Sequence, residues 1–453
     1  MASKKQFLRQ AGQVAFDPQH RKKIQFNLGK YFSAVEKGLT RFSDFQKARD
    51  IAAAVKDYAL NNLDSLVPQL VENMEKNGIE VYFAADHRQA RDIINRIIEA
   101  ENARLVVKSK SMTTEEIGLN EFLQKKGVEV LETDLGEFIV QIAGEKPYHI
   151  VTPAMHKSRQ DVARLYHRIF GTPENATPEE LTKFTRKFLR EKFTRADVGI
   201  TGANFLVADI GAIALTENEG NAFMSFSFPR VHIAIAGFEK IIPSYRHLSF
   251  MWQVLANRGT GQSITVYNSI VRGPRRNGEE NGPERMIVIL LDNGRTDILA
   301  TEQQRLSLKC IRCGACLNYC PIYQNVGGYT YDAVYSGPIG SVLMPFFKGF
   351  KEYGHLSFAC TVCRKCEEVC PVEIPLPDLL LLNRREYVEK GLAPATERLS
   401  FRMFGLLIKS PALFKINFHG LKNLLVKPVK NKLWGKQRAF PEFKTPFRKK
   451  FRK

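Results

Sequence analysis

The chain has 453 residues, of which 44% are hydrophobic and 25% charged, a composition typical of a folded protein rather than a disordered one. It contains no apolar run near the ~20 residues that a membrane-spanning helix needs, and its first residues lack the apolar core of a secretory signal, so we expect a cytoplasmic protein. The formal net charge is +20, and residues 401–453 hold fifteen Lys/Arg but one acid, Glu442. The length predicts two or three domains.

The first predicted elements are polar helices, which make up an N-terminal helical segment over residues 1–64. After a further helix over 63–77, strand and helix patterns alternate. This alternation predicts a largely parallel sheet with helices on its faces. We expect strands over 79–84, 104–108 and 128–131, and helices over 87–102 and 113–126, the last with Thr114 as a candidate cap.

A helical stretch follows over residues 158–193, and Thr177-Pro178-Glu179-Glu180 within it is typical of a helix start. Further strands are expected over 213–216, 231–236 and 286–291. These patterns predict an α/β domain over 65–300, a cysteine-containing domain over 303–392 and a basic C-terminal region over 393–453.

All eight cysteines lie in two motifs with the same spacing, C-x2-C-x2-C-x3-C-P, which is a bacterial [4Fe–4S] signature. Three thiolates two residues apart surround one cluster, and in two-cluster ferredoxins the fourth cysteine of each motif ligates the other cluster. Zinc sites use pairs of cysteines rather than evenly spaced triplets. We therefore predict two [4Fe–4S] clusters, the first bound by Cys310, Cys313, Cys316 and Cys370 and the second by Cys360, Cys363, Cys366 and Cys320.

Residues near the clusters have expected roles of their own. Gly314 would allow a close approach of the backbone to the cluster, and Ile311 and Val372 belong to an expected apolar shell that tunes the potential. His355, five residues before Cys360, is expected at the surface, and tuning of that cluster is the alternative role. A purely structural role for the clusters is a second interpretation of the same motifs.

Two polar segments of the α/β domain are weak candidates for catalysis or ligand binding. Lys108-Ser109-Lys110-Ser111-Met112 follows a strand, and ligands of open α/β sheets bind at the carboxyl ends of strands. Lys108 and Lys110 would suit a carboxylate or a phosphate. Glu219 lies in the expected turn Asn218–Asn221 and could act as a base or orient a ligand. The alternative is that these segments only cap helices and form turns.

These segments and the doubled cysteine motif resemble the lactate utilisation protein B family. The resemblance covers nearly the whole chain and includes Thr201-Gly202-Ala203-Asn204, Asp209-Ile210-Gly211 and His232-Ile233-Ala234. The resemblance implies a LUD domain, with a fold related to CoA-transferase and sugar-phosphate isomerase domains, followed by a mostly helical two-cluster ferredoxin-like domain. The long spacer between the motifs is similar to that of the all-helical ferredoxin domains in fumarate reductase and heterodisulfide reductase subunits.

The family resemblance implies an iron–sulfur electron-transfer subunit of a multi-subunit complex that oxidises L-lactate to pyruvate. Lactate gives up two electrons whereas each cluster accepts one, so we expect a partner subunit to split the pair and this chain to be a non-catalytic component. No phosphate-binding loop is present, and Gly259-Thr260-Gly261 lacks the third glycine of a dinucleotide site. The alternatives are a relay for a glycolate or glycerol 3-phosphate dehydrogenase, or a LUD domain with its own active site.

The basic C-terminal region admits three interpretations. It is a docking arm for an acidic partner subunit, a peripheral contact with an anionic membrane surface, or a solvated disordered end. No nucleic-acid-binding module is recognisable, so no nucleic-acid partner is expected. The sequence leaves open the electron donor, the terminal acceptor, the cluster potentials and the oligomeric state.

Overall fold

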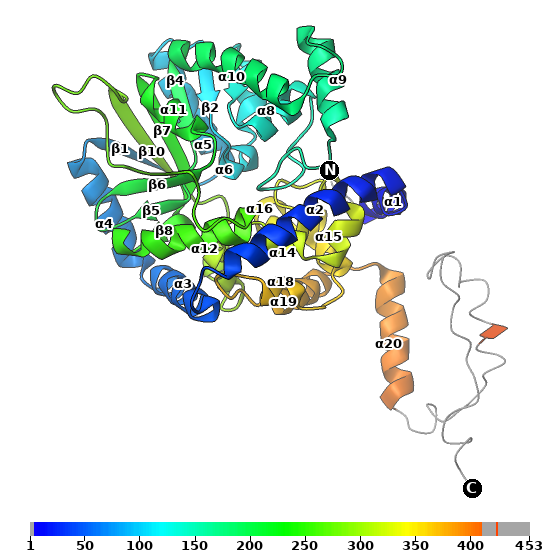
Figure 1. Cartoon of the computed structure of the whole chain (residues 1–453). Helices are drawn as coiled ribbons and strands as arrows, with labels where there is room; N and C mark the ends of the chain where they lie inside the picture. Colours follow the sequence, from blue (N-terminus) through cyan, green and yellow to red (C-terminus); the bar gives the residue numbers. More distant parts are fainter. Residues whose placement is uncertain (1–3, 410–422, 425–453) are drawn as a thin grey trace. The chain divides into compact units, whose positions relative to one another are not determined.

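The computed structural model describes residues 4–409, 423 and 424 (Figure 1). The chain divides into two units, residues 1–387 and 388–453. The expected basic tail therefore lies largely outside the described residues. No helix in the part of the chain that the structure describes has the length and apolarity to span a membrane.

The centre of the first unit is a six-stranded sheet in which all neighbouring strands are parallel, as the alternating pattern predicts. Every residue of the central strand β7 is buried, which is typical of a parallel sheet covered on both faces. The strand order is β1 (Ile79–Ala84), β10 (Arg285–Leu291), β7 (Val231–Gly237), β4 (Val198–Thr201), β2 (Leu105–Lys108) and β3 (Glu129–Glu132).

Side chains of β10 alternate between two hydrophobic clusters because successive residues of a strand point to opposite faces. Ile287 and Ile289 pack with α5 (His87–Ala100) on one face, whereas Met286 and Val288 pack with α4 (Leu63–Lys76) on the other. The remaining helices of the α/β part are α6 (Met112–Glu116), α7 (Leu119–Lys125), α8 (Leu135–Ile142), α9 (Arg159–Phe170), α10 (Pro178–Arg195), α11 (Asn221–Ser227), α12 (Leu248–Thr260) and α13 (Arg295–Leu299).

One sequence expectation is confirmed in detail and another is wrong. Thr177 caps α10 through a reciprocal pair of hydrogen bonds with Glu180. The single helix expected over 113–126 is two helices, α6 and α7, which are separated at Gly118. Gly118 has φ +62°, and the Arg91 guanidinium donates to the carbonyl of Ile117 just before it, so the chain turns there. The cap of α6 is Ser111 rather than Thr114.

A smaller second sheet has the order β8 (Ile241–Ile242), β5 (Phe205–Val207), β6 (Ala212–Glu217) and β9 (Tyr267–Val271). Strand β6 runs antiparallel to both of its neighbours and ends at the turn that holds Glu219. Gly220 has φ +71°, a backbone conformation that glycine adopts without steric cost.

Three N-terminal helices, α1 (Lys4–Val14), α2 (Pro18–Leu39) and α3 (Phe45–Asn61), share a hydrophobic cluster with the cysteine region. His355 belongs to this interior, in contrast to its expected surface position, because its ring packs edge-on against Phe7 at 6.0 Å between centroids. The cysteine region contains α14 (Ala315–Asn318), α15 (Pro321–Val326), α16 (Gly337–Lys348), α17 (Phe350–Tyr353), α18 (Lys365–Glu368) and α19 (Leu376–Glu389).

Five short 3-10 helices connect the larger elements: η1 (Phe238–Lys240), η2 (Tyr245–His247), η3 (Gln304–Lys309), η4 (Tyr329–Tyr331) and η5 (Gly354–Ala359). The second unit contains α20 (Ala395–Lys409), which exposes large apolar side chains among basic ones. Phe401 and Leu406 are 74% and 67% exposed.

Candidate cluster centre and adjoining pocket

The two cysteine motifs repeat in backbone conformation as well as in sequence. Arg312 and Val362, at equivalent positions, both have positive φ, +61° and +57°. Each donates its N–H to the sulfur two residues earlier, Arg312 to Cys310 Sγ at 3.4 Å and Val362 to Cys360 Sγ at 3.2 Å. Amides directed at cysteine sulfurs stabilise thiolates and tune the potential of an iron–sulfur cluster.

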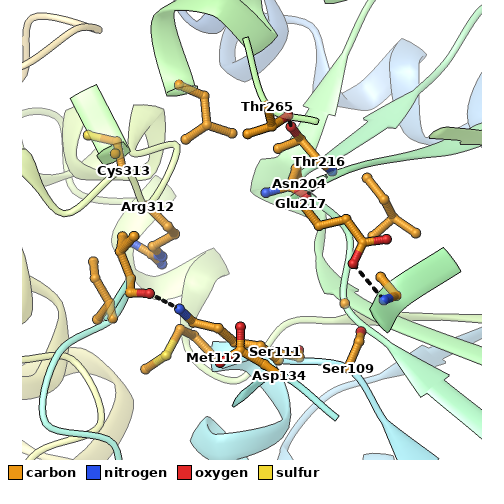
Figure 2. Close-up of a pocket in the computed structure, with 18 of the residues that line it drawn as sticks. Ser109, Ser111, Met112, Asp134, Asn204, Thr216, Glu217, Thr265, Arg312 and Cys313 are labelled. Atoms are coloured by element: carbon orange, nitrogen blue, oxygen red, sulfur yellow. Dashed lines mark hydrogen bonds between the residues drawn. The ribbon is translucent and has the colours of Figure 1, made fainter. Parts of the chain in front are cut away.

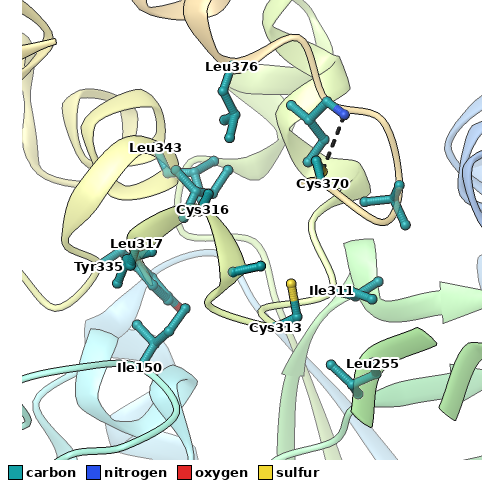
Figure 3. Packing of buried hydrophobic residues seen from close by; sticks show 14 of the residues in the cluster. Ile150, Leu255, Ile311, Cys313, Cys316, Leu317, Tyr335, Leu343, Cys370 and Leu376 are labelled. Carbon is teal, nitrogen blue, oxygen red and sulfur yellow. Dashed lines mark hydrogen bonds between the residues drawn. The ribbon is translucent and has the colours of Figure 1, made fainter. Parts of the chain in front are cut away.

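The structure brings together the four cysteines predicted to bind the first cluster. Cys310, Cys313, Cys316 and Cys370 line one small cavity, although Cys370 comes from the second motif. Figure 3 shows Cys313, Cys316 and Cys370 among the buried side chains. The amide of Ile374 donates to Cys370 Sγ at 3.4 Å. Four thiols inside an apolar shell are a donor set that fits a [4Fe–4S] cluster. The apolar wall consists of Ile150, Ile311, Ile339, Val372, Ile374 and Leu376.

The fourth cysteine of each motif lies near the thiols of the other motif. Burial raises the pKa of Cys320 to about 11, and the nearby Cys360 and Cys363 thiols add to this shift. Burial likewise raises the pKa of Cys370 to about 11, and Cys310 adds to it. Such thiols become ligands when bound iron takes the place of the proton. Cys363 is exposed, so the second set of thiols reaches the surface.

Gly314 marks the place where the α/β part contacts the first cysteine loop. It has φ +77°, and a Cβ there would lie 2.9 Å from His149 Cε1 and from Val151 Cγ2. The equivalent residue of the second motif, Arg364, has φ +61° and an exposed side chain. The backbone conformation is thus common to both motifs, whereas the close contact with His149 and Val151 is specific to Gly314. The approach of Gly314 to the cluster stays a prediction.

A cavity of about 380 Å³ lies between the first cysteine loop and the carboxyl ends of strands β2 and β4 (Figure 2). Lys110 and Glu219, two of the three weak candidates, both line it. Cys313 lines it as well, so the cavity touches the proposed ligand set of the first cluster. Its position agrees with the general rule that open α/β sheets bind ligands at the carboxyl ends of their strands.

Lys108, the third candidate, is not among the residues that line this cavity. Its side chain is 1% exposed, and its Nζ lies 2.6 Å from Glu132 Oε1 and 3.1 Å from Glu115 Oε1. Burial lowers the pKa of Lys108, but the two carboxylates outweigh this effect and raise it. Lys108 therefore holds a buried ion pair at the end of β2.

Glu219 lies on the acidic side of the cavity. Its Oε2 accepts the N–H of Leu135 at 3.0 Å. Removal of water around the carboxyl group and the charge of Asp134 raise the pKa of Glu219 to about 7. Glu217 lies beside it and accepts the amides of Ala222 and Phe223, each at 2.7 Å. Glu219 can therefore accept or release a proton near neutral pH.

Arg312 is a cavity residue that sequence reasoning missed. Its side chain is 9% exposed, and its Nη2 lies 3.5 Å from Glu239 Oε1. The guanidinium also lies 4.5 Å from the ring centroid of Tyr335, whereas the buried Nη1 has no hydrogen-bond partner in the structure. The available signal was that Arg312 is the one charged residue between Cys310 and Cys316.

A buried ion network joins the cysteine region to the sheet. Arg295 pairs with Glu116 at 2.9 Å and with Glu239 at 2.6 Å, and all three side chains are 1% exposed. The hydroxyl of Tyr335, from the cysteine region, donates to Glu116 Oε2 at 2.9 Å. These bonds hold the loop of Arg312 at the carboxyl end of β7.

The chain matches two domain families, the LUD domain over residues 67–291 and the 4Fe-4S dicluster domain over residues 307–374. These matches define the protein as a LUD-domain protein with a 4Fe-4S dicluster domain, so its cofactors are two [4Fe–4S] clusters. They also confirm the order of the two domains.

Two curated relatives align with most of the chain. "Lactate utilization protein B" of Bacillus subtilis is 43% identical over 375 residues, which cover 82% of this chain and 78% of the relative. The "Uncharacterized electron transport protein YkgF" of Escherichia coli is 43% identical over 381 residues, which cover 84% and 80%. The chain belongs to the lactate utilization protein B family, as the sequence motifs indicated.

One solved structure, a DUF162 family protein from Deinococcus radiodurans, covers 51% of this chain and 98% of its own, at 14% identity and a TM-score of 0.30. The relation of the LUD domain to CoA-transferase and isomerase folds stays a prediction.

Proposed function

We propose that this protein is an electron-transfer subunit of a multi-subunit complex that oxidises L-lactate to pyruvate. The names of the two relatives, lactate utilization protein B and electron transport protein, support this proposal. Bound [4Fe–4S] clusters would supply one-electron transfer. Cys310, Cys313, Cys316 and Cys370 would hold one cluster, and Cys360, Cys363, Cys366 and Cys320 the other.

The observation that carries the proposal is the different exposure of the two thiol sets. In the first set Cys313, Cys316 and Cys370 are buried, and Cys313 faces the cavity. In the second set Cys363 is exposed. An electron carrier needs one centre near a protein surface where a partner can dock, and the second set supplies it.

The remaining parts of the proposal concern partners and organisation. The surface around Cys363 is the proposed contact with other subunits, and the basic region 393–453 is a proposed docking arm or peripheral membrane contact. The proposed domain division is 1–64, 65–300, 303–392 and 393–453. The proposed location is the cytoplasm, and the alternative is association with the membrane through partner subunits.

A growth experiment tests the proposed function. A strain that lacks this gene is grown with L-lactate as sole carbon source, and it is complemented with the wild-type gene or with Cys316→Ser. We expect growth on lactate to require the wild-type gene, whereas growth on glucose serves as control and immunoblots show equal amounts of protein. Normal growth of the deleted strain on lactate, without a second lactate route, would contradict the proposal.

Glycolate and glycerol 3-phosphate are the alternative donors, and the same strains distinguish them. If the clusters serve one of these donors, the deleted strain and the Cys316→Ser strain fail on that carbon source and grow on L-lactate. The third alternative, a LUD domain with its own ligand site, is supported by the cavity itself.

A further inference from the structure

The cavity beside Cys313 has walls of opposite charge. Lys110, Lys240 and Arg312 form a basic wall near the cysteine loop, whereas Glu217 and Glu219 lie on an acidic wall with Asp134. Figure 2 shows Arg312 and Cys313 on one side of the cavity, with Glu217 and Asn204 opposite. A volume of about 380 Å³ lies within the range of small-molecule sites.

Arg312 shares its carboxylate partner with a second arginine. Its ion-pair partner, Glu239, also pairs with Arg295 at the shorter distance of 2.6 Å, against 3.5 Å for Arg312. The Nη1 atom of Arg312 is buried without a hydrogen-bond partner. A buried donor is normally satisfied, so this nitrogen indicates a missing acceptor. A guanidinium with a free edge binds the planar oxygen pair of a carboxylate.

The basic wall contains two further cations. Lys110 donates to the carbonyl of Val151. Within the described residues, no hydrogen bond or ion pair joins Lys110 to a carboxylate. Lys240 lines the same cavity, and its charge interacts with that of Arg312. An anion at this wall would therefore be attracted by three cations.

The opposite wall limits which anions fit. Glu217 and Glu219 repel a second negative charge and accept hydrogen bonds from hydroxyl groups. Asn204 at the same wall offers both a donor and an acceptor. The two walls together select a singly charged organic acid with hydrogen-bond donors and disfavour phosphate, which carries more charge near neutral pH.

We propose that this chain itself binds a small organic monocarboxylate in the cavity between the LUD sheet and the first cysteine loop, with the carboxylate on Arg312 and the donor groups of the ligand toward Glu217 and Glu219. Because Cys313 lines the same cavity, the bound acid lies beside the first ligand set. The proposal goes beyond the relay function and rests on it only for the choice of L-lactate as a probe.

Binding to the full-length protein with its clusters tests this proposal. Anaerobic titration calorimetry uses L-lactate, pyruvate and inorganic phosphate as separate probes. We expect saturable binding of L-lactate or pyruvate with one site per chain, and weaker binding of phosphate. Arg312→Gln and Lys110→Met should each weaken binding by about tenfold, the effect of one lost charge-assisted hydrogen bond.

Arg364→Gln is the matched control, because Arg364 has the same charge and lies in the loop of the other cysteine motif, paired with Glu367 and Asp378 outside the cavity. It should leave binding unchanged. Iron content is measured for each variant, to show that the clusters are intact. If Arg312→Gln loses iron, the proposal is judged on the binding affinity of Lys110→Met.

Three outcomes would overturn the proposal: no saturable binding of either acid, phosphate binding as tight as theirs, or equal losses in the Lys110 variant and the Arg364 control. A protein that supports growth on lactate but binds neither acid would overturn only this inference and leave the relay function intact.

Discussion

Arg312, in the loop between Cys310 and Cys313, reaches Glu239 just beyond the end of strand β7, with 3.5 Å between Nη2 and Oε1. Its backbone N–H meanwhile points to Cys310 Sγ at 3.4 Å. One residue thus contributes to the predicted cluster loop, to the buried ion network and to the cavity. The LUD sheet and the cysteine region therefore meet at Arg312.

The exchange of cysteines between the two motifs can be tested with paired substitutions. Each single Cys→Ser variant should lose one of two clusters, from about eight irons to about four. Because Cys370 and Cys310 are proposed to serve the same cluster, the double variant Cys370→Ser/Cys310→Ser should lose no more iron than either single one. The double variant Cys370→Ser/Cys366→Ser should lose both clusters. Iron content and Mössbauer spectra measure this, and the opposite pattern would show that each motif binds its own cluster.

Gly314→Ala should destabilise the contact between the α/β part and the cysteine loop. The new Cβ would meet His149 and Val151 at 2.9 Å, and φ is +77°. We expect a loss of about 2–5 kcal/mol, the sum of backbone strain and overpacking. Gly127→Ala is the control, because Gly127 has φ +81° but no atom within 4 Å of the new Cβ. Anaerobic thermal unfolding should show a clearly smaller shift for Gly127→Ala, and equal shifts would contradict the packing argument.

Arg295→Met should be among the most destabilising single changes in the chain. It would leave Glu116 and Glu239 buried without their shared cation, which typically costs about 3–5 kcal/mol. Arg195→Met, which breaks an exposed pair with Glu191, should cost less than about 1 kcal/mol. Melting temperatures followed by circular dichroism compare the two, and a small effect at Arg295 would mean that the network contributes little to stability.

Carboxylate binding in the cavity should weaken as the pH rises through about 7. Burial of the carboxyl group away from water and the negative charge of Asp134 raise the pKa of Glu219 to about 7. The charge of Glu217 adds to this shift, and the charge of Lys110 opposes it. Below this value Glu219 is neutral, and above it the added negative charge repels the ligand. The same ionisation lowers folding stability between pH 4.5, the ordinary pKa, and about 7, because the folded state then binds more protons than the unfolded state.

Titrations with L-lactate from about pH 6 to about pH 8 measure this dependence. Glu219→Gln should bind lactate with a flatter pH profile, since the titrating carboxyl group is gone. A profile that is unchanged in this variant would assign the pH dependence to another group.

The spacing within each motif predicted which thiols lie in one loop. The exchange of Cys320 and Cys370 between the clusters follows the pattern of two-cluster ferredoxins and stays a prediction. The sheet was predicted in outline, but β4 was missed. This strand contains Gly199, whose missing side chain leaves room for the carbonyl of Ser225. The pattern of apolar residues carries little signal in such a strand.

The cavity was predicted in part. Lys108 and Lys110 were both expected at a ligand site. Strand β2 ends at Lys108, so Lys110 lies past the regular alternation of the strand. Of these two lysines, Lys110 lines the cavity and Lys108 does not. The role of Arg312 could not be predicted, because it depends on a contact with Glu239, which is 73 residues away in the sequence.

The most direct test of the central claim is the redox state of the clusters during lactate oxidation. Anaerobic extracts of cells that contain the full complex are mixed with L-lactate, glycolate or glycerol 3-phosphate and frozen, and electron paramagnetic resonance detects reduced [4Fe–4S] clusters. Extracts with the Cys316→Ser and Cys366→Ser variants serve as controls. We predict that L-lactate alone reduces the clusters of this protein and that each variant lacks one of the two signals. Clusters that remain oxidised while lactate is converted to pyruvate would contradict the account.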